Sequence, residues 1–290
     1  MTDRVGFIGL GNMGAPMADR LVGRAGGLTV CDMRPEIVAK YTEAGADSAD
    51  TAAAVAERSD VISIAVVDDA QVRAVVDGPD GILRAAKPGT VVAVHSTIAD
   101  TTAQELAKLC AGHEVEFVDA PVSGGAQGAK RGGLAVMVGG TEAAFRRIEA
   151  PFAAFADLIV HAGPVGAGTR MKLARNLLHF VAFTAATEAS RLAEASGLDI
   201  TALGKVVRHS DAITGGAGAI MLRESTAPIA DGDFWQSIFG HVRDLGEKDL
   251  SLALGLGERL DVALPLAALA LTGLGDGLGV GPGTIARAQD

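Results

Sequence analysis

Three glycines near the amino terminus, Gly9, Gly11 and Gly14, most restrict the fold that this chain can adopt. They follow a hydrophobic run, Val5–Gly9, and precede a helix-like segment, Ala15–Arg24. In a βαβ unit the first glycine permits a tight turn and the second lets a ligand approach the backbone. The third lets the helix pack close to the strand. The run therefore predicts an α/β domain that opens with a strand, a tight turn and a helix.

The same run predicts a dinucleotide site. The amino end of the helix would offer free N–H groups and a partial positive charge to phosphates, which lets an acidic chain bind an anion. Asp32 ends the second predicted strand, 18 positions after Gly14, near the spacing of the carboxylate that binds the adenosine ribose. That carboxylate would repel a 2′-phosphate and favours NAD, whereas Arg34 could pair with the phosphate and keeps NADP possible.

Short β-branched runs alternate with helix-like segments through about the first 160 residues. This alternation is typical of parallel strands joined by crossover helices, and the apolar character of the runs predicts a sheet covered on both faces. After Val5–Gly9 the predicted strands are Leu28–Asp32, Val61–Val66, Val91–His95, Glu116–Ala120, Leu134–Val138 and Leu158–His161. Further helices are predicted at Glu36–Ala44 and Thr101–Ala111.

A second domain is predicted after the glycine- and proline-containing stretch Gly163–Gly166. The segment from Gly168 to Ala195 has the pattern of one long helix, and helical patterns without a strand follow it. We therefore predict a Rossmann-type doubly wound α/β domain over residues 1–163. An all-helical substrate and dimerisation domain is predicted over residues 164–290.

Composition excludes several classes of partner. The net charge of −10 lacks the Lys/Arg excess that nucleic-acid binding needs. Cys31 and Cys110 are too few and too far apart for a disulfide framework or a metal site, so no metal is expected. Met1–Arg4 leads directly into the first strand without room for a signal peptide. The apolar stretch between Asp261 and Asp276 is shorter than the about 20 residues of a membrane span. We expect a soluble, cytoplasmic protein.

Three later segments carry side chains suited to chemistry. Asp119–Gly125 lies at the carboxyl end of a predicted strand. Its Ser-Gly-Gly turn would offer N–H groups and a hydroxyl to a carboxylate, or it could be only a structural turn. Lys172 and Asn176 are four residues apart on one face of a predicted helix, so both can contact the same substrate. Beside an oxidised nicotinamide, the pKa of Lys172 would be lowered and the amine could exchange a proton near neutral pH. Taken alone, however, a lysine on a helix is usually a solvated surface residue. Lys248–Ala253 alone would be interpreted as an exposed charged turn.

Together, and in this order, these segments resemble the β-hydroxyacid dehydrogenase family, which includes 3-hydroxyisobutyrate dehydrogenases and tartronate semialdehyde reductases. The resemblance runs from Val5 to about Ala253 and covers the glycine run, the Ser96-Thr97 pair, DAPVSGG, the GxGxxxKxxxN helix and KDLxLA. It implies hydride transfer between a nicotinamide cofactor and a small 3-hydroxy acid or the matching semialdehyde. The substrate would thus be a small carboxylate.

The resemblance also implies roles for individual residues. Lys172 would be the general acid/base and Asn176 its substrate-positioning neighbour. Ser123, Gly124 and Gly125 would hold the substrate carboxylate, and Lys248 would close over the cofactor from the helical domain. The residues expected at the cofactor are Gly9, Leu10, Gly11, Asn12, Met13, Gly14, Asp32, Met33, Arg34, Val66, Val67, Ser96, Thr97 and Lys248.

Several positions differ from the pattern common in the family. Arg175 replaces a frequent Asn, and could be a second anion anchor or a solvent-facing replacement. His241 replaces a frequent aromatic, and could hydrogen-bond the distal group of the substrate or only fill the space. Val94 stands where an acidic residue is frequent, and the tail Leu278–Gly283 lacks an acidic Gly-Asp-x-Asp pattern. These differences bear on the substrate more than on the chemistry.

Two other functions fit parts of the pattern. An imine reductase would share the fold and the cofactor turn, but such enzymes generally lack the lysine found at Lys172. A non-catalytic dinucleotide-binding protein would leave Lys172, Asn176 and DAPVSGG without a role. The Leu- and Ala-rich segment from Leu250 to Leu278 has more apolar surface than one small domain hides. It predicts a homodimer or homotetramer through the helical domain, as the resemblance also implies.

Overall fold

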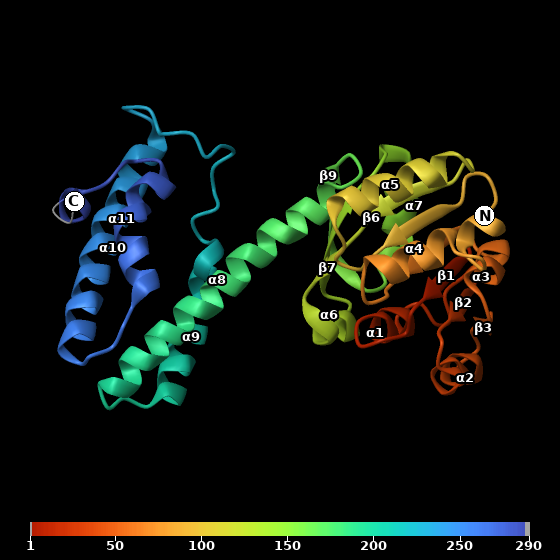
Figure 1. Ribbon diagram of the computed structural model, residues 1–290, viewed down its shortest axis with the longest axis horizontal. Helices are drawn as coiled ribbons and strands as arrows, with labels where there is room; N and C mark the ends of the chain where they lie inside the picture. The colour runs from red at the N-terminus through yellow and green to blue at the C-terminus, as the bar shows by residue number, and fades with distance from the viewer. Residues whose placement is uncertain (1, 288–290) are drawn as a thin grey trace. The chain divides into compact units, whose positions relative to one another are not determined.

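The computed structural model describes residues 2–287 as an α/β unit followed by a helical unit (Figure 1). The two compact units meet in the sequence between Arg175 and Asn176. The predicted class, a Rossmann-type doubly wound sheet followed by an all-helical domain, is confirmed. The predicted boundary between residues 163 and 164 stays a prediction. Residue 1 and residues 288–290, at the outer ends of the predicted domains, lie outside the described residues.

The sheet of the first unit has the strand order β3-β2-β1-β4-β5-β6-β8-β7, with β9 paired to β8. The strands are β1 Val5–Ile8, β2 Leu28–Cys31, β3 Asp47–Ser48, β4 Val61–Ile64, β5 Val91–Val94, β6 Glu116–Asp119, β7 Val122–Ser123, β8 Leu134–Gly139 and β9 Ala156–Gly163. β1 pairs in parallel with both β2 and β4, so the strand order reverses beside β1. The expectation of parallel strands is wrong for β8, which runs antiparallel to β6 and β7.

Helices cover both faces of the sheet, because alternate residues of its central strands face opposite cores. Val5 and Phe7 of β1 belong to one hydrophobic cluster, together with side chains of α1, α2, α6 and α7. Ile8 belongs to the other cluster, with side chains of α3, α4 and α5. A strand buried on both faces has no polar alternation, which explains the near-continuous apolar runs in the sequence.

The helices of the first unit are α1 Gly14–Asp19, α2 Pro35–Glu43, α3 Ala52–Arg58, α4 Asp69–Asp77, α5 Asp100–Ala111, α6 Gly125–Arg131 and α7 Glu142–Phe152, with a 3₁₀ turn at Ile82–Arg84. α1 is shorter than the predicted Ala15–Arg24, because a series of turns begins at Arg20. The second unit contains α9 Ile200–Thr214, a 3₁₀ turn at Gly216–Gly218, α10 Phe234–Arg259, α11 Pro265–Leu278 and α12 Thr284–Arg287. The predicted long helix is α8, Ala167–Ala195.

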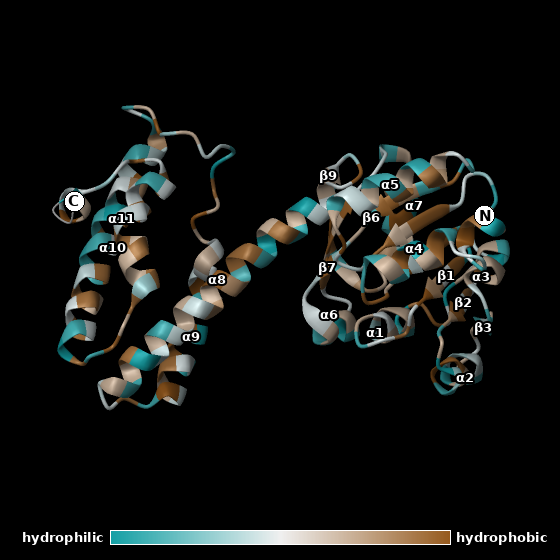
Figure 2. Cartoon of the chain, viewed as in Figure 1, coloured by the Kyte–Doolittle hydropathy of each residue, from teal (hydrophilic) through white to brown (hydrophobic). Residues whose placement is uncertain are grey.

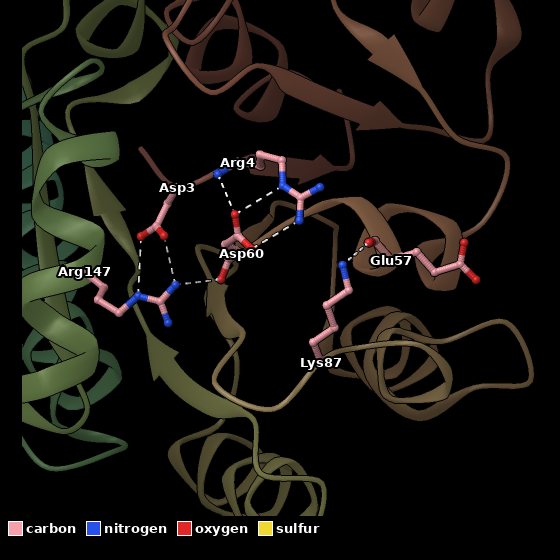
Figure 3. A network of polar contacts seen from close by, with 6 residues as sticks. All are labelled: Asp3, Arg4, Glu57, Asp60, Lys87 and Arg147. Carbon is pink, nitrogen blue, oxygen red and sulfur yellow. Dashed lines mark hydrogen bonds and ion pairs between the residues drawn. The ribbon is translucent and has the colours of Figure 1, made fainter. Parts of the chain in front are cut away.

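A network of ion pairs joins the amino ends of the strands (Figure 3). Asp60, just before β4, accepts a hydrogen bond from the Arg4 backbone N–H at 2.9 Å and pairs with its guanidinium at 3.3 Å. Asp3 pairs with Arg147 of α7 at 3.1 Å. Such partly exposed pairs contribute at most about 1 kcal/mol each. Because ligands bind at the carboxyl ends of the strands in this class of fold, we assign the network to stability.

Two buried carboxylates organise the helical unit. Glu188 of α8 accepts hydrogen bonds from the backbone N–H groups of Leu266 and Ala267, at 2.9 and 3.1 Å, at the start of α11. Glu247 of α10 accepts from Gly283 and Ala286 at 2.7 and 3.1 Å. Each carboxylate accepts hydrogen bonds from N–H groups at the start of a helix, where the helix itself provides no acceptor. In the described part of the chain, no helix is long and apolar enough to cross a membrane.

Candidate active site

The glycine turn after β1 has the geometry that the sequence predicts. Gly9 has a φ of +92°, a conformation that favours glycine. A Cβ atom on Gly14 would lie 1.9 Å from the Gly9 carbonyl oxygen, so α1 can begin this close to β1 only with glycine there. A Cβ atom on Gly11 would meet nothing within 4 Å. The space beside its backbone is therefore open to a pyrophosphate.

A pocket of about 710 Å³ adjoins this turn. Gly9 and Gly11 line it together with residues after β2 and β4, among them Asp32, Met33, Arg34, Val66 and Val67. Met33 and Val67 are large apolar residues, yet they are 98% and 81% exposed. Ligand pockets combine such apolar walls with a few polar groups. The charged residues that line this pocket are Asp32, Arg34, Asp50 and Asp80.

The carboxylate of Asp32 is tied to the glycine turn and to Arg34. It accepts a hydrogen bond from the Leu10 backbone N–H at 2.6 Å, and the Arg34 guanidinium pairs with it at 2.8 Å. The same guanidinium donates to the Leu10 carbonyl at 3.1 Å. The hydrogen bond from Arg34 is the largest cause that holds the pKa of Asp32 below its usual value. Asp32 is therefore ionised at neutral pH, beside the ligand pocket.

Ser96, after β5, holds the backbone that follows β4. Its hydroxyl donates to the Val66 carbonyl at 2.7 Å and accepts from the Val66 N–H at 3.0 Å. Ser96 is buried, whereas Thr97 is exposed. The hydroxyl of Ser96 thus fixes one wall of the pocket. The expected position of Ser96 and Thr97 at the cofactor stays a prediction.

Asp119, at the end of β6, is fully buried and holds the start of α8. Its carboxylate accepts hydrogen bonds from the backbone N–H groups of Gly166 and Thr169, both at 2.6 Å. Burial is the largest influence on this carboxyl and raises its pKa. A Cβ atom on Gly168 would lie 2.3 Å from the Met137 carbonyl oxygen. The helix can approach the sheet this closely because residue 168 is a glycine.

The DAPVSGG segment, Asp119–Gly125, continues past β6 along the sheet. Ser123 ends the two-residue strand β7, so it is part of the sheet and not of the turn that the sequence predicts. The turn consists of Gly124 and Gly125, whose φ angles are +128° and +65°. Both glycines are exposed, and α6 begins at Gly125. Their role and that of Ser123 in holding a carboxylate stay predictions.

Lys172 of α8 lies against this segment. Its Nζ donates a hydrogen bond to the Val122 carbonyl at 2.7 Å, and the residue is only 9% exposed. Burial, followed by the charge of Arg175, lowers the pKa of the Lys172 amine. Asn176 lies four residues further along α8. Lys172 is therefore not the solvated surface lysine that its helix alone would predict.

The other candidates belong to the helical unit. Lys248 and His241 are exposed residues of α10, and Lys248 pairs with Asp249 at 3.1 Å. Their roles at cofactor and substrate stay predictions. His209, Ser210 and Asp211 are consecutive exposed residues of α9 and point in different directions around the helix, as expected. Within residues 2–287 we find no cluster of three His, Cys, Asp or Glu side chains that could hold a metal.

Sequence reasoning missed Asp119 and His95. His95 is buried among Phe7, Phe152 and Phe155, and its ring nitrogens contact the Ala120 carbonyl at 2.8 Å and the Ser63 hydroxyl at 3.0 Å. Burial lowers its pKa to about 4. It is a neutral residue of the core that joins neighbouring strands. Neither role leaves a local signal, since both depend on contacts between distant segments.

The comparisons with known proteins agree with this geometry. Residues 4–163 match the model of the NAD-binding domain of 6-phosphogluconate dehydrogenase. Residues 166–274 match the model described as the NAD-binding domain of NADP-dependent 3-hydroxyisobutyrate dehydrogenase. Together the two models span the glycine turn, the DAPVSGG segment and α8. An NAD(P)-binding protein of the dehydrogenase type follows from these matches.

Relatives that align over most of both chains also support a dehydrogenase. An uncharacterized oxidoreductase of Mycobacterium tuberculosis is 60% identical over 279 residues, which cover 96% of this chain and 94% of the relative. The 2-(hydroxymethyl)glutarate dehydrogenase of Eubacterium barkeri is 35% identical, with 92% of this chain and 86% of the relative covered. A crystal structure of an oxidoreductase from Mycobacterium avium superposes with a TM-score of 0.92 at 55% identity, covering 97% of this chain and 100% of that one. The chain belongs to the β-hydroxyacid dehydrogenase family and is an NAD(P)-dependent oxidoreductase.

Proposed function

We propose that this protein interconverts a small 3-hydroxy acid and its semialdehyde, with Lys172 as the general acid/base. The observation that carries the proposal is the position of Lys172, buried and hydrogen-bonded to Val122 beside Ser123. A general acid/base works best when its pKa lies near the operating pH. Burial and the charge of Arg175 both lower the pKa of this amine in that direction.

Each residue of the proposed site has one task. The backbone N–H groups of Gly124 and Gly125, with the Ser123 hydroxyl, hold the substrate carboxylate. Lys172 and Asn176 contact the reacting oxygen, and Lys172 takes the hydroxyl proton during oxidation or returns it during reduction. When bound, the nicotinamide ring accepts or supplies the hydride. A neutral amine still has N–H donors, so its bond to Val122 can persist while the proton moves.

We further propose that the protein prefers NAD. Asp32 is ionised and lines the adenosine pocket, where it can accept hydrogen bonds from ribose hydroxyls and repel a 2′-phosphate. Arg34 is paired with Asp32, and that pairing competes with any bond from Arg34 to a phosphate. Gly11 leaves room for the pyrophosphate, as a bound dinucleotide of either kind requires.

A substrate panel tests the proposed reaction. The protein is assayed with 3-hydroxy acids and NAD or NADP, and separately with semialdehydes or cyclic imines and the reduced cofactors, at the nicotinamide absorbance. We expect turnover of 3-hydroxy acids with NAD and none of imines, because imine reductases generally lack the lysine found here at position 172. Imine turnover without acid turnover would assign the second function. Tight NAD binding without any turnover would indicate a non-catalytic binding protein.

We propose that the helical unit forms a homodimer or homotetramer. No side chain of α9 is buried, although the helix is 15 residues long. Leu177, Phe180 and Phe183 of α8 are 57–69% exposed, and Figure 2 shows hydrophobic residues recurring along this helix. A 15-residue helix with no buried side chain, such as α9, is marginal in water, so a second copy of the chain would stabilise it. Sedimentation of a monomer at micromolar concentration would contradict this.

A further inference from the structure

The segment that follows β6 contacts α8 at two points. At the first point, the Asp119 carboxylate accepts hydrogen bonds from the Gly166 and Thr169 N–H groups. At the second, the Val122 carbonyl accepts the hydrogen bond from Lys172. Asp119 and Val122 are three residues apart, and so are Thr169 and Lys172. The spacing on the helix is close to one turn.

The first point is a strong attachment. Both hydrogen bonds of the carboxylate measure 2.6 Å, and Asp119 has no exposed surface. N–H groups in the first turn of a helix have no acceptor within the helix, so the carboxylate satisfies donors that would otherwise be buried and unpaired. Short hydrogen bonds to a carboxylate are among the stronger ones in proteins.

The packing around Asp119 leaves the helix little room to move. A Cβ atom on Gly139 would lie 2.4 Å from Asp119 Oδ1, and one on Gly168 would lie 2.6 Å from the Asp119 carbonyl oxygen. Gly166 has a φ of +89°, so the chain turns sharply into the helix at the residue that Asp119 binds. The start of α8 therefore has one position against β6 and β8.

We propose that Asp119 is a positioning residue, which holds the first turn of α8 so that the Lys172 amine lies against Val122 at the proposed site. This rests on the proposed function of Lys172 as acid/base. Asp119 itself does not touch the reacting atoms in this account. Without its two hydrogen bonds the first turn would be held by packing alone, and a misplacement of about 1 Å can lower a rate by about 100-fold.

The variant Asp119→Asn tests the proposal. Asparagine has the same shape but replaces one acceptor by a donor, so one of the two N–H groups loses its partner. We expect kcat to fall about 10- to 100-fold, with unchanged affinity for NAD in calorimetry. Asp60→Asn is the matched control, because it removes a carboxylate acceptor at the opposite edge of the same unit. We expect it to retain wild-type kcat.

A second readout follows Lys172 directly. Competitive labelling of amines with trace acetic anhydride, resolved by mass spectrometry, gives the pKa of the Lys172 amine without substrate or cofactor. In Asp119→Asn the pKa should rise toward the usual lysine value, because the amine becomes more solvated. An unchanged Lys172 titration, whatever happens to kcat, would overturn the positioning role.

A third measurement needs no variant, so it tests the attachment even if Asp119→Asn fails to fold. Amide hydrogen exchange of the wild-type protein should show slow exchange at Gly166 and Thr169, because both N–H groups donate to the Asp119 carboxylate. Fast exchange at both amides would overturn the attachment. Full activity of a Lys172→Ala variant would instead contradict the acid/base proposal, while the labelling and exchange results would still measure the attachment.

Discussion

The Lys172 amine donates a hydrogen bond of 2.7 Å to the backbone carbonyl of Val122, the residue that precedes Ser123. This contact joins two segments that are 50 residues apart in sequence. It places the proposed acid/base directly beside the proposed carboxylate-binding turn. Both the Lys172 amine and the Gly124–Gly125 turn lie within the first unit, so their proposed roles can be tested in separate variants.

The pH dependence of oxidation should report the lowered pKa of Lys172. The neutral amine is the form that accepts the hydroxyl proton, so kcat/KM for oxidation should rise with pH and level off above the pKa of the amine. Since burial lowers that pKa, the rise should be complete below the usual lysine pKa of about 10.4. A rise centred on the usual lysine value would contradict a buried acid/base.

Replacement of Arg175 should move this profile. In Arg175→Asn the positive charge that helps to lower the pKa of Lys172 is lost, so the rise in kcat/KM should shift to higher pH. Arg170→Gln is the control, because Arg170 is also an arginine of α8 and is not among the causes that lower the pKa of Lys172. If Arg175→Asn instead raises KM for substrates with a second anionic group and leaves the profile in place, Arg175 is a substrate anchor.

Asp32 should decide the choice between NAD and NADP. In Asp32→Asn we expect ADP-ribose to bind about 10-fold more weakly, since hydrogen bonds to charged groups contribute about 1.5–3 kcal/mol. The 2′-phosphorylated analogue should bind more tightly than it does to the wild type, because the repulsion is removed. Calorimetry with both compounds measures this, and Asp47→Asn serves as an exposed control on β3. Equal affinities in wild type and variant would refute the assignment.

His95 should make stability depend on pH. Its pKa is about 4 in the folded protein, below the usual value of 6.5, because the charged ring would be buried. The contribution of the neutral His95 ring to the free energy of unfolding is fully present above pH 6.5. It is lost as the pH falls toward 4, and the loss reaches up to about 3 kcal/mol for a pKa shift of this size. Urea unfolding of the wild type and His95→Gln between pH 7 and 4 should show a shallower decline in the variant. Parallel declines would contradict this account.

Local patterns predict much of this fold. The apolar runs indicate the central strands to within two residues at each end, and the glycine spacing indicates the turn at Gly9. β3 and β7 were missed, because a strand of two residues shows no period. For the same reason, the Ser-Gly-Gly sequence predicts a turn that includes Ser123, although Ser123 belongs to β7.

The site could be predicted less completely than the fold. Lys172 was recognised from a family motif, since nothing local distinguishes it from a surface lysine. Its burial depends on Val122, and the position of its helix depends on Asp119, both about 50 residues earlier. Such long-range contacts leave no spacing signal in one sequence. Asp119 was therefore noticed only as the first letter of a motif and not as the residue that holds α8.

Substitution of Lys172 tests the central proposal most directly. Lys172→Ala should lower kcat by about 10²- to 10⁴-fold, the usual effect of removing a positioned acid/base. Calorimetry should show unchanged affinity for NAD. Lys172→Arg should be almost as inactive, because a guanidinium keeps the charge but does not release a proton near neutral pH. Full turnover in Lys172→Ala would contradict the account.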